Sequence, residues 1–426
     1  MFILFLSCAN TGSFAGVDSE LGRSGYAGSI VQLEKNKKSL YKNKDAILYY
    51  LDKGMLCHYA QEYSDSSKLL EDGERAIEDA FTKSITREIS TYLVNDNARE
   101  YGGEDYEDIY INAFNALNYY HRQDSEGAMV EIRRMNSKLR YLAFKYDAAI
   151  SNIQKKALEE NLPEIPPNPN APSKFSDSAL ARYLGMLFYR GAGLHDDARI
   201  DRDWLLAAFA NFPAVYNHPI PSSLNDELNI PSGMARLNVI AFGGLSPIKK
   251  ENVIRIPLLN GRWIKIALPE MVSRHSEITK VEFVFDPGNS FEMELLENID
   301  AVAKETFKAR QQLIYLRTIV RAIAKTAGSS VLKAAARETD SNKGVLLELF
   351  SIFTQIFAEV SERADIRVSR YFPARAYIGG INLPPGRYSF QVKYYRRDGT
   401  EIASVAYREM IVRENTLNLA EAVCLK

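Results

Sequence analysis

The residue near the start of this sequence that most directly suggests chemistry is Cys8. An apolar run at residues 2–6 and the small residue Ser7 precede it. This order is typical of the end of a bacterial lipoprotein signal, which is cleaved before a cysteine whose thiol is then acylated. Phe5 stands where leucine is usual, and no basic segment precedes the apolar run. The alternative is an apolar strand with an incidental cysteine, but we expect lipidation at Cys8.

Acylation at Cys8 divides the N-terminal region into two parts. Residues 1–7 are then a signal-peptide remnant. Residues 8–30 are a lipidated flexible tether, because small polar residues support little packing. Ala9 follows the cysteine in place of the aspartate that retains lipoproteins in the inner membrane of enteric bacteria. We therefore expect a lipid anchor on the periplasmic face of the outer membrane, with the inner membrane as the alternative.

The other candidates for catalysis or metal binding lack the required spacing. The five histidines form no HExxH or HxH pattern, and the cysteines form no CxxC pair. Ser246 lacks the second glycine of a nucleophile elbow, because Ile248 stands two residues after it. We therefore expect no catalytic residue, no metal, no cofactor and no enzymatic activity. A disulfide between Cys57 and Cys424 is possible in an oxidising periplasm.

Two charged clusters each have a binding interpretation and a structural one. The four acids within residues 104–108 could bind a cation, or could favour the start of a helix and solvate its outer face. Arg133 and Arg134 could clamp a carboxylate or phosphate, or could lie on a solvated face and pair with Glu131. The structural interpretation is the favoured one for both clusters.

Composition limits the class of protein. The chain has 426 residues, 46% of them hydrophobic and 25% charged, which favours a globular protein of two or three domains. A net charge of −1 provides no basic field for nucleic acid, so we expect none as a partner. No stretch reaches the ~20 apolar residues of a membrane-spanning helix. The nearest candidate, Val345 to Val360, is interrupted by Glu348, Gln355 and Glu359.

Helical periodicity between Lys44 and Leu142 occurs in two similar units. Gly54 in the first unit matches Ala116 in the second, an offset of 62 residues (116 − 54). Small residues at these places would let two antiparallel helices approach closely. A third, looser unit lies between Leu184 and Phe209, and its turn is one residue longer.

These units predict a TPR-like helical domain over residues 31–216. A Pro-rich linker at residues 161–176 lies inside it, because proline fixes φ and removes backbone donors.

Strand patterns follow the helical part. Residues 217–292 are predicted to be β-rich, and residues 366–426 to complete the same β-domain, with a hairpin turn at Asp398-Gly399. Residues 293–365 carry helical periodicity and predict a helical pair inserted in the β-domain. The fold class is therefore α+β: N-terminal TPR-like helical hairpins followed by a small β-sandwich-like domain interrupted by a long helical pair.

Aromatic and histidine side chains gather near positions that line the concave face of such hairpins. A ring with an apolar body and a polar tip suits contact with a peptide or a glycan. The same residues can equally be filler between helices. The residues that we assign to a partner-binding groove are His58, Tyr59, Tyr110, Tyr120, His121, Arg133 and Arg134.

A series of motifs extends over nearly the whole chain. It comprises Gly54, Tyr63-Ser64-Asp65-Ser66, Asp105-Tyr106-Glu107, Ala116-Leu117-Asn118-Tyr119, residues 130–136, 183–189, 266–269 and 297–303, and Ala364-Asp365-Ile366-Arg367. In this order the motifs resemble an uncharacterised family of bacterial outer-membrane lipoproteins with N-terminal TPR-like repeats. Ser369 stands where that family leads us to expect tryptophan. The resemblance implies an envelope location and a helical scaffold, and it implies no catalytic residue.

The sequence therefore favours a membrane-anchored, periplasm-facing lipoprotein. Its TPR-like repeats would bind other envelope proteins as a scaffold, in the assembly or maintenance of a cell-envelope complex. The alternative is an envelope carbohydrate-binding protein or enzyme with a site between the β-domain and the helices. A third hypothesis is a pore or secretion accessory in which the 345–360 helix touches lipid. The oligomeric state does not follow from the sequence.

Overall fold

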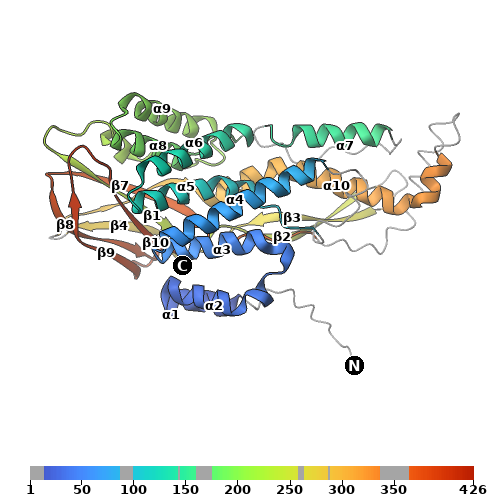
Figure 1. Ribbon diagram of the computed structural model, residues 1–426, viewed down its shortest axis with the longest axis horizontal. Helices are drawn as coiled ribbons and strands as arrows, with labels where there is room; N and C mark the ends of the chain where they lie inside the picture. The colour runs from blue at the N-terminus through green and yellow to red at the C-terminus, as the bar shows by residue number, and fades with distance from the viewer. Residues whose placement is uncertain are drawn as a thin grey trace.

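A helical N-terminal part is followed by β-sheets, which confirms a mixed α and β architecture (Figure 1). The computed structural model describes residues 14–86, 99–142, 144–159, 175–257, 263–285, 288–335 and 364–426. The predicted signal remnant with Cys8, most of the Pro-rich linker and the second helix of the expected pair lie outside the described residues.

The segment expected to be a tether is helical where the structure describes it. Helices α1 (Ala15–Arg23) and α2 (Gly25–Leu40) contact each other, and Val17 and Leu33 are fully buried. The prediction of a flexible tether over residues 8–30 is therefore wrong from α1 onward. The physical reason is that apolar residues recur among the small ones often enough to reach the core.

Three helical hairpins follow α2. Their helices are α3 (Ala46–Tyr59) with α4 (Tyr63–Thr86), α5 (Asp105–His121) with α6 (Ser125–Leu142), and α8 (Ala179–Gly191) with α9 (His195–Asn211). The shorter helices are η1 (Asn43–Asp45) before α3, α7 (Asp147–Glu159) after α6, and η4 (Ser222–Asp226) after α9. These hairpins coincide with the three helical units of the sequence.

One turn conformation recurs in all three hairpins. Gln61, Gln123 and Gly193 have positive φ angles of 64°, 63° and 74°. The N–H of each bonds to the carbonyl three residues earlier, and the following N–H bonds to the carbonyl five residues before it. Each connection has three residues, so the prediction of a longer third turn is wrong. The offset of 62 residues between the first two turns is confirmed (123 − 61).

Small residues bring the helices of a hairpin together, as the sequence predicts. A Cβ added to Gly54 of α3 would come within 2.8 Å of the Leu70 side chain on α4. Ala116 of α5 is fully buried. Gly185 has the same role in α8, because an added Cβ would meet the Asp201 carboxylate of α9.

The β-rich part contains two four-stranded sheets and a two-stranded hairpin within the described residues. The central sheet has the order β10-β1-β7-β6, with β10 (Asn418–Cys424), β1 (Ala235–Gly243), β7 (Arg375–Leu383) and β6 (Glu294–Asn298). The outer sheet has the order β5-β4-β8-β9, with β5 (Ser290–Glu292), β4 (Lys280–Phe285), β8 (Gly386–Tyr395) and β9 (Glu401–Val412). The hairpin pairs β2 (Ile248–Pro257) with β3 (Trp263–Val272).

The central sheet is buried on both faces. On β1, Leu237, Val239 and Ala241 join a core shared with the outer sheet, whereas Ile240 and Phe242 join the core of the helices. Every residue of β1 is buried for this reason. β10 pairs with β1 in parallel, whereas β7 pairs with β1 antiparallel. The described chain is thus layered as helices, central sheet and outer sheet.

The inserted helix begins later than its periodicity predicts. Residues 294–298 form β6 by pairing with β7, and α10 (Ile299–Ala335) starts after them. Pairing with a strand some 80 residues away (378 − 294 = 84) overrides the local helical pattern. The β8–β9 hairpin is confirmed, although only Gly399 of its expected Asp398-Gly399 pair has positive φ.

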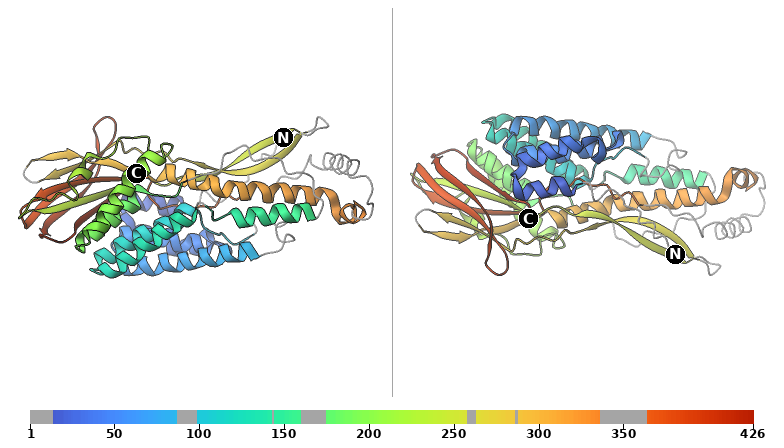
Figure 2. Two further views of the ribbon diagram at one scale, coloured as in Figure 1. Left: turned by 90° about the horizontal axis from the view of Figure 1, so that it is seen from above. Right: turned by 90° about the horizontal axis from the view of Figure 1, so that it is seen from below.

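Helices α7 and α10 and the β2–β3 hairpin extend together from the rest of the molecule, and we call them the arm (Figure 2). A small core of its own forms where Leu313 and Leu316 of α10 meet Tyr146 and Ile153. Among the helices that the structure describes, none combines the length and the apolar character needed to cross a lipid bilayer.

The shared turn provides a matched test of backbone strain. A residue with a side chain adopts positive φ at a cost of roughly 1 kcal/mol. A Cβ added to Gly193 would meet no atom within 4 Å, so Gly193→Gln changes the conformational cost alone. We expect Gly193→Gln to lower the free energy of unfolding by about 1 kcal/mol, and Gln123→Gly to raise it by up to about as much. Urea unfolding measures the free energy of unfolding of both variants. A change of the same sign in the two variants would contradict a shared turn.

Candidate functional site

Five of the seven residues assigned to a partner groove lie at the interface between the helices and the chain's own sheets. His58, Tyr59 and Tyr110 are buried there. The Tyr59 hydroxyl donates to the Tyr371 carbonyl at 2.9 Å, in the segment that enters the central sheet. The prediction of an open groove is therefore wrong in the described structure, because strands from the second half of the chain fill that face of the helices.

Tyr120 caps the β10 edge of the central sheet. Its hydroxyl accepts a hydrogen bond from the Leu419 N–H at 2.9 Å and donates to the Leu417 carbonyl at 3.2 Å. The Tyr407 hydroxyl does the same for Glu421, at 3.0 Å from its N–H and 2.6 Å from its carbonyl. These hydroxyls replace a neighbouring strand along the β10 edge, which would otherwise offer unpaired groups to another chain.

Tyr110 belongs to a buried site around Glu297 of β6. The Glu297 carboxylate accepts hydrogen bonds from the hydroxyls of Tyr110, Tyr216 and Ser178, and from the Leu180 N–H at 3.1 Å. Burial raises the pKa of Glu297, against the effect of these donors. The site fixes the start of α8 on the central sheet.

Arg133 and Arg134 do not join the other predicted groove residues. Arg133 is exposed on α6. The Arg134 guanidinium bonds to Glu74 of α4 at 2.5 Å and to Glu131 at 3.1 Å. The expected pairing with Glu131 is therefore confirmed, and it ties the outer helices α4 and α6 together.

His58 and His121 meet at a single carboxylate. Nε2 of His58 lies 2.6 Å from one oxygen of Glu421 on β10, and Nε2 of His121 lies 3.0 Å from the other. Burial opposes the charge of His58, but the charge of Glu421 and the hydrogen bonds that Glu421 and Asn118 accept outweigh it and raise the pKa of His58. Burial also opposes the charge of Glu421, but the two histidines lower its pKa to about 2. The first two hairpins thus hold the same strand.

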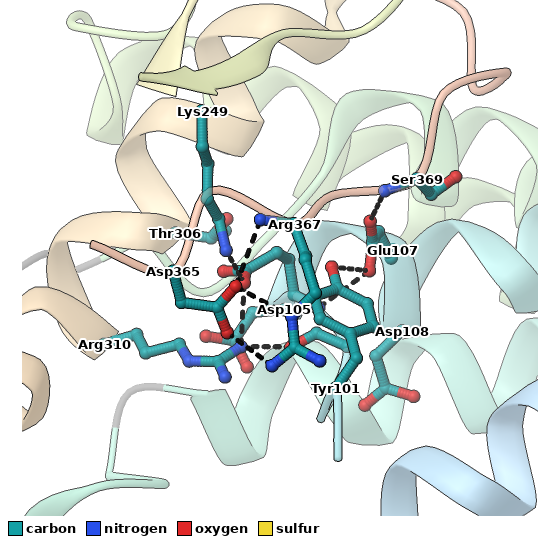
Figure 3. Close-up of polar contacts among 12 residues, drawn as sticks. Tyr101, Asp105, Glu107, Asp108, Lys249, Thr306, Arg310, Asp365, Arg367 and Ser369 are labelled. Carbon is teal, nitrogen blue, oxygen red and sulfur yellow. Dashed lines mark hydrogen bonds and ion pairs between the residues drawn. The ribbon is translucent and has the colours of Figure 1, made fainter. Parts of the chain in front are cut away.

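A charged joint connects the hairpins to the arm at the start of α5 (Figure 3). Lys249 of β2 and Arg310 of α10 both pair with Glu104, with the guanidinium at 3.0 Å. Asp105 accepts from Lys145 at 2.8 Å, and Asp108 accepts from Lys138 at 2.6 Å. The acids do favour the start of α5, where Glu107 and Glu104 form a capping box.

The expectation that these acids solvate the outer face of the helix is wrong. Glu104, Asp105, Glu107 and Asp108 are all buried, because the arm and residues 364–374 cover this end of α5. Buried carboxylates persist where cations or hydrogen-bond donors compensate them. The joint is therefore suited to holding the arm against the hairpins.

Two buried carboxylates accept hydrogen bonds from the backbone of residues 364–374, the connecting segment that leads into β7. Oε1 of Glu107 accepts from the Ser369 N–H at 2.7 Å, and Oδ1 of Asp52 accepts from the Arg370 N–H at 2.6 Å. Burial and the adjacent Glu104 charge raise the pKa of Glu107 to about 7. Burial raises the pKa of Asp52 to about 6, against the hydrogen bonds that it accepts.

Ion pairs to the N-terminal elements hold the same segment. Arg367 bonds to Asp45 of η1 at 2.9 Å and to Asp365 at 2.8 Å. Asp18 of α1 accepts from the Arg370 guanidinium at 2.7 Å and from the Tyr371 hydroxyl at 2.8 Å. Helix α1, which lies where a flexible tether was expected, therefore helps to hold the connecting segment in place.

The two described cysteines lie in the interior of the protein. Cys57 and Cys424 are both buried free thiols, so the structure does not contain the disulfide considered from the sequence. Among the described residues, no group of three or more histidine, cysteine and acidic side chains is arranged to hold a metal ion.

No known protein family, curated protein or solved structure matches this chain. The resemblance to envelope lipoproteins therefore stays a prediction.

Sequence reasoning missed Glu297, Glu421 and Asp52. Each contacts groups far away in the sequence, and such contacts leave no local motif. Glu421 does carry a usable signal, since it is a lone acid within the otherwise uncharged strand β10. An acid in such a place requires a buried partner.

Asp52 and Glu107 together predict a specific pH dependence. Both have folded-state pKa values above the ordinary ones, so their contribution to stability is full below about pH 4 and is lost as the pH rises through about 6 and about 7. We expect the free energy of unfolding to decrease between about pH 4.5 and 7, with each group contributing up to ~1.4 kcal/mol per pH unit. The double variant Asp52→Asn, Glu107→Gln should flatten this slope.

Urea unfolding of the wild type and the double variant at several pH values in this range measures the slope. Asp203→Asn is the matched control, because Asp203 is exposed on α9 and its change should leave the slope intact. An unchanged slope in the double variant would show that neither carboxylate retains its proton in the folded protein.

Proposed function

We propose that this protein is a lipid-anchored, periplasm-facing scaffold that helps to assemble or maintain a cell-envelope complex. In this proposal the three hairpins are TPR-like repeats, and the central and outer sheets form a β-sandwich-like domain. The shared turn of the hairpins and the core between the two sheets support this description. The anchor is a lipid on Cys8.

One observation carries the proposal, and it concerns the two helices of each hairpin. The first helices, α3, α5 and α8, pack against the sheets, whereas the second helices α6 and α9 expose apolar residues to solvent. Val130 of α6 and Ile200 of α9 each lie seven residues after the positive-φ residue of their hairpin (130 − 123, 200 − 193). They are 49% and 46% exposed. Trp204, one helical turn after Ile200, is 51% exposed. Tryptophan is enriched among the residues that dominate the binding energy of protein–protein contacts.

The geometry gives less support to an enzyme or a carbohydrate-binding protein. That alternative requires a site between the β-rich part and the helices. The side chains of His58, Tyr110 and Glu297 at this interface are buried and bonded to other groups of the same chain. We therefore propose a protein without catalytic activity whose partners are other envelope proteins.

Crosslinking in cells tests where partners bind. A photoreactive amino acid at Ile200 or Trp204 should give a crosslink to a specific protein, because these side chains are exposed on α9. The same amino acid at Val31, which is exposed on α2, is the matched control and should give none. Ile200→Asp should weaken the crosslink from position 204 at least about tenfold, the effect of ~1.4 kcal/mol. Equal crosslinking from positions 31 and 204 would argue against a docking surface on α9.

Cell fractionation tests the anchor separately. We expect the mature chain to begin at an acylated Cys8, as mass spectrometry of the N-terminal peptide would show. Cys8→Ala should move the protein from the membrane fraction to the soluble fraction, because the acyl chains supply the binding energy. An unmodified N-terminus with the wild-type location preserved in Cys8→Ala would disprove lipid anchoring.

A further inference from the structure

A chain of hydrogen bonds fixes the orientation of one side-chain amide beside His58. The Ser66 hydroxyl donates to the Gly54 carbonyl at 2.8 Å, so its oxygen is free to accept. Nδ2 of Asn118 donates to that oxygen at 2.9 Å and also faces Oδ1 of Asn115 at 3.3 Å. An amide nitrogen placed between two acceptors leaves the amide oxygen on the other side. Oδ1 of Asn118 therefore points at the imidazole.

Both nitrogens of His58 face oxygens that accept hydrogen bonds. Nδ1 lies 2.7 Å from Oδ1 of Asn118, and Nε2 lies 2.6 Å from Oε1 of Glu421. A neutral imidazole has one N–H and can donate at only one of these nitrogens. Both contacts are hydrogen bonds only when both nitrogens carry a proton, which makes His58 a cation.

This cation is held in an apolar and aromatic enclosure. The His58 side chain is 1% exposed, and the Phe114 ring lies edge-on to it with centroids 5.0 Å apart. Tyr59 and Tyr63 pack against the imidazole from α3 and α4. A buried charge of this kind is stable only while its partner carboxylate stays in place.

We propose that the second proton of His58 is a pH-sensitive catch that keeps β10 docked on the first two hairpins. Below about pH 6.5 the imidazolium bonds at once to Asn118 of α5 and to Glu421 of β10. When the proton leaves at alkaline pH, one of these bonds is lost and Glu421 keeps a buried charge without its cation. β10 then loosens from α3 and α5, and the faces of these helices become accessible.

The raised pKa of His58 determines whether a higher pH strengthens or weakens the docking of β10. Its pKa is raised in the folded protein, so the stabilisation is complete below the ordinary histidine pKa and is lost as the pH rises through the folded value. Glu421 stays ionised throughout this range, because its pKa is about 2.

Other titratable side chains also face the His58–Glu421 pair. Tyr59, Tyr63 and, across Glu421, Tyr407 of β9 face the site, and burial raises the pKa of each, to about 12 for Tyr407. These three stay neutral between about pH 6 and 9. His121 is the other imidazole at Glu421, and it stacks on Tyr63 with centroids 4.4 Å apart.

His121 is the matched control for His58. Its Nε2 contact with Glu421, at 3.0 Å, requires a single N–H, which a neutral imidazole or a glutamine amide can provide. His121→Gln should therefore preserve the catch. His58→Gln should remove it, because a glutamine amide carries no charge to compensate Glu421. The inference does not rest on the proposed scaffold function.

Nuclear magnetic resonance of the histidine-labelled full chain tests the protonation directly. The sequence has only five histidines, and the His58→Gln and His121→Gln variants assign the two signals. We expect both ring nitrogens of most His58 side chains to carry protons at about pH 6.5, where an ordinary histidine is only half protonated. A His58 ring with one bare nitrogen at this pH would overturn the proposal.

Hydrogen exchange of residues 418–424 tests the docking of β10. After correction for the intrinsic pH dependence of exchange, protection in the wild type should fall at least about tenfold between about pH 6 and 9, the effect of losing one hydrogen bond to a charged group. His121→Gln should show the same fall, whereas His58→Gln should be weakly protected at both values. If His58→Gln fails to fold, Asn118→Leu removes one acceptor and should move the fall to lower pH. Protection that is independent of pH in the wild type would overturn the catch.

Discussion

Burial of the central sheet on both faces is the constraint on which the rest of this structure depends. A sheet with one wet face can place its polar groups in water, but here the helices cover one face and the outer sheet covers the other. Each polar side chain on the central strands then needs a partner within the protein, since an unpaired buried group costs roughly 1–3 kcal/mol. Glu297 and Glu421 satisfy this requirement through hydroxyls, imidazoles and backbone N–H groups of the helices.

These pairs also explain how the parts of the chain hold their relative positions. Apolar contacts between the hairpins and the sheet supply most of the attraction, but they discriminate little between neighbouring registers. A carboxylate with directed partners specifies one register, as Glu421 does for β10 and as Glu104 does for the arm. The energetic value of each pair is modest, because desolvation offsets much of the attraction. Their contribution is specificity of position.

The sequence predicts the local elements well and the contacts between distant ones poorly. Hairpins with small residues such as Gly54, and the β8–β9 pair, follow from periodicity, because their stabilising contacts are close in sequence. The prediction of a groove is wrong because His58 meets Glu421, 363 positions away, and Tyr120 meets Leu419, 299 positions away. The strand before α10 was missed for the same reason. A pattern of residue types shows that a face is amphipathic but does not show what covers it.

The position of β10 in the chain order has a consequence for biosynthesis. Residues 418–424 form an edge of the central sheet, beside a strand that is translated about 180 residues earlier (418 − 237 = 181). Helical hairpins are local structures and can form while the chain is still emerging, whereas this sheet has to wait for its final strand. During that interval the incomplete sheet exposes an unpaired edge and apolar surface, both of which favour aggregation.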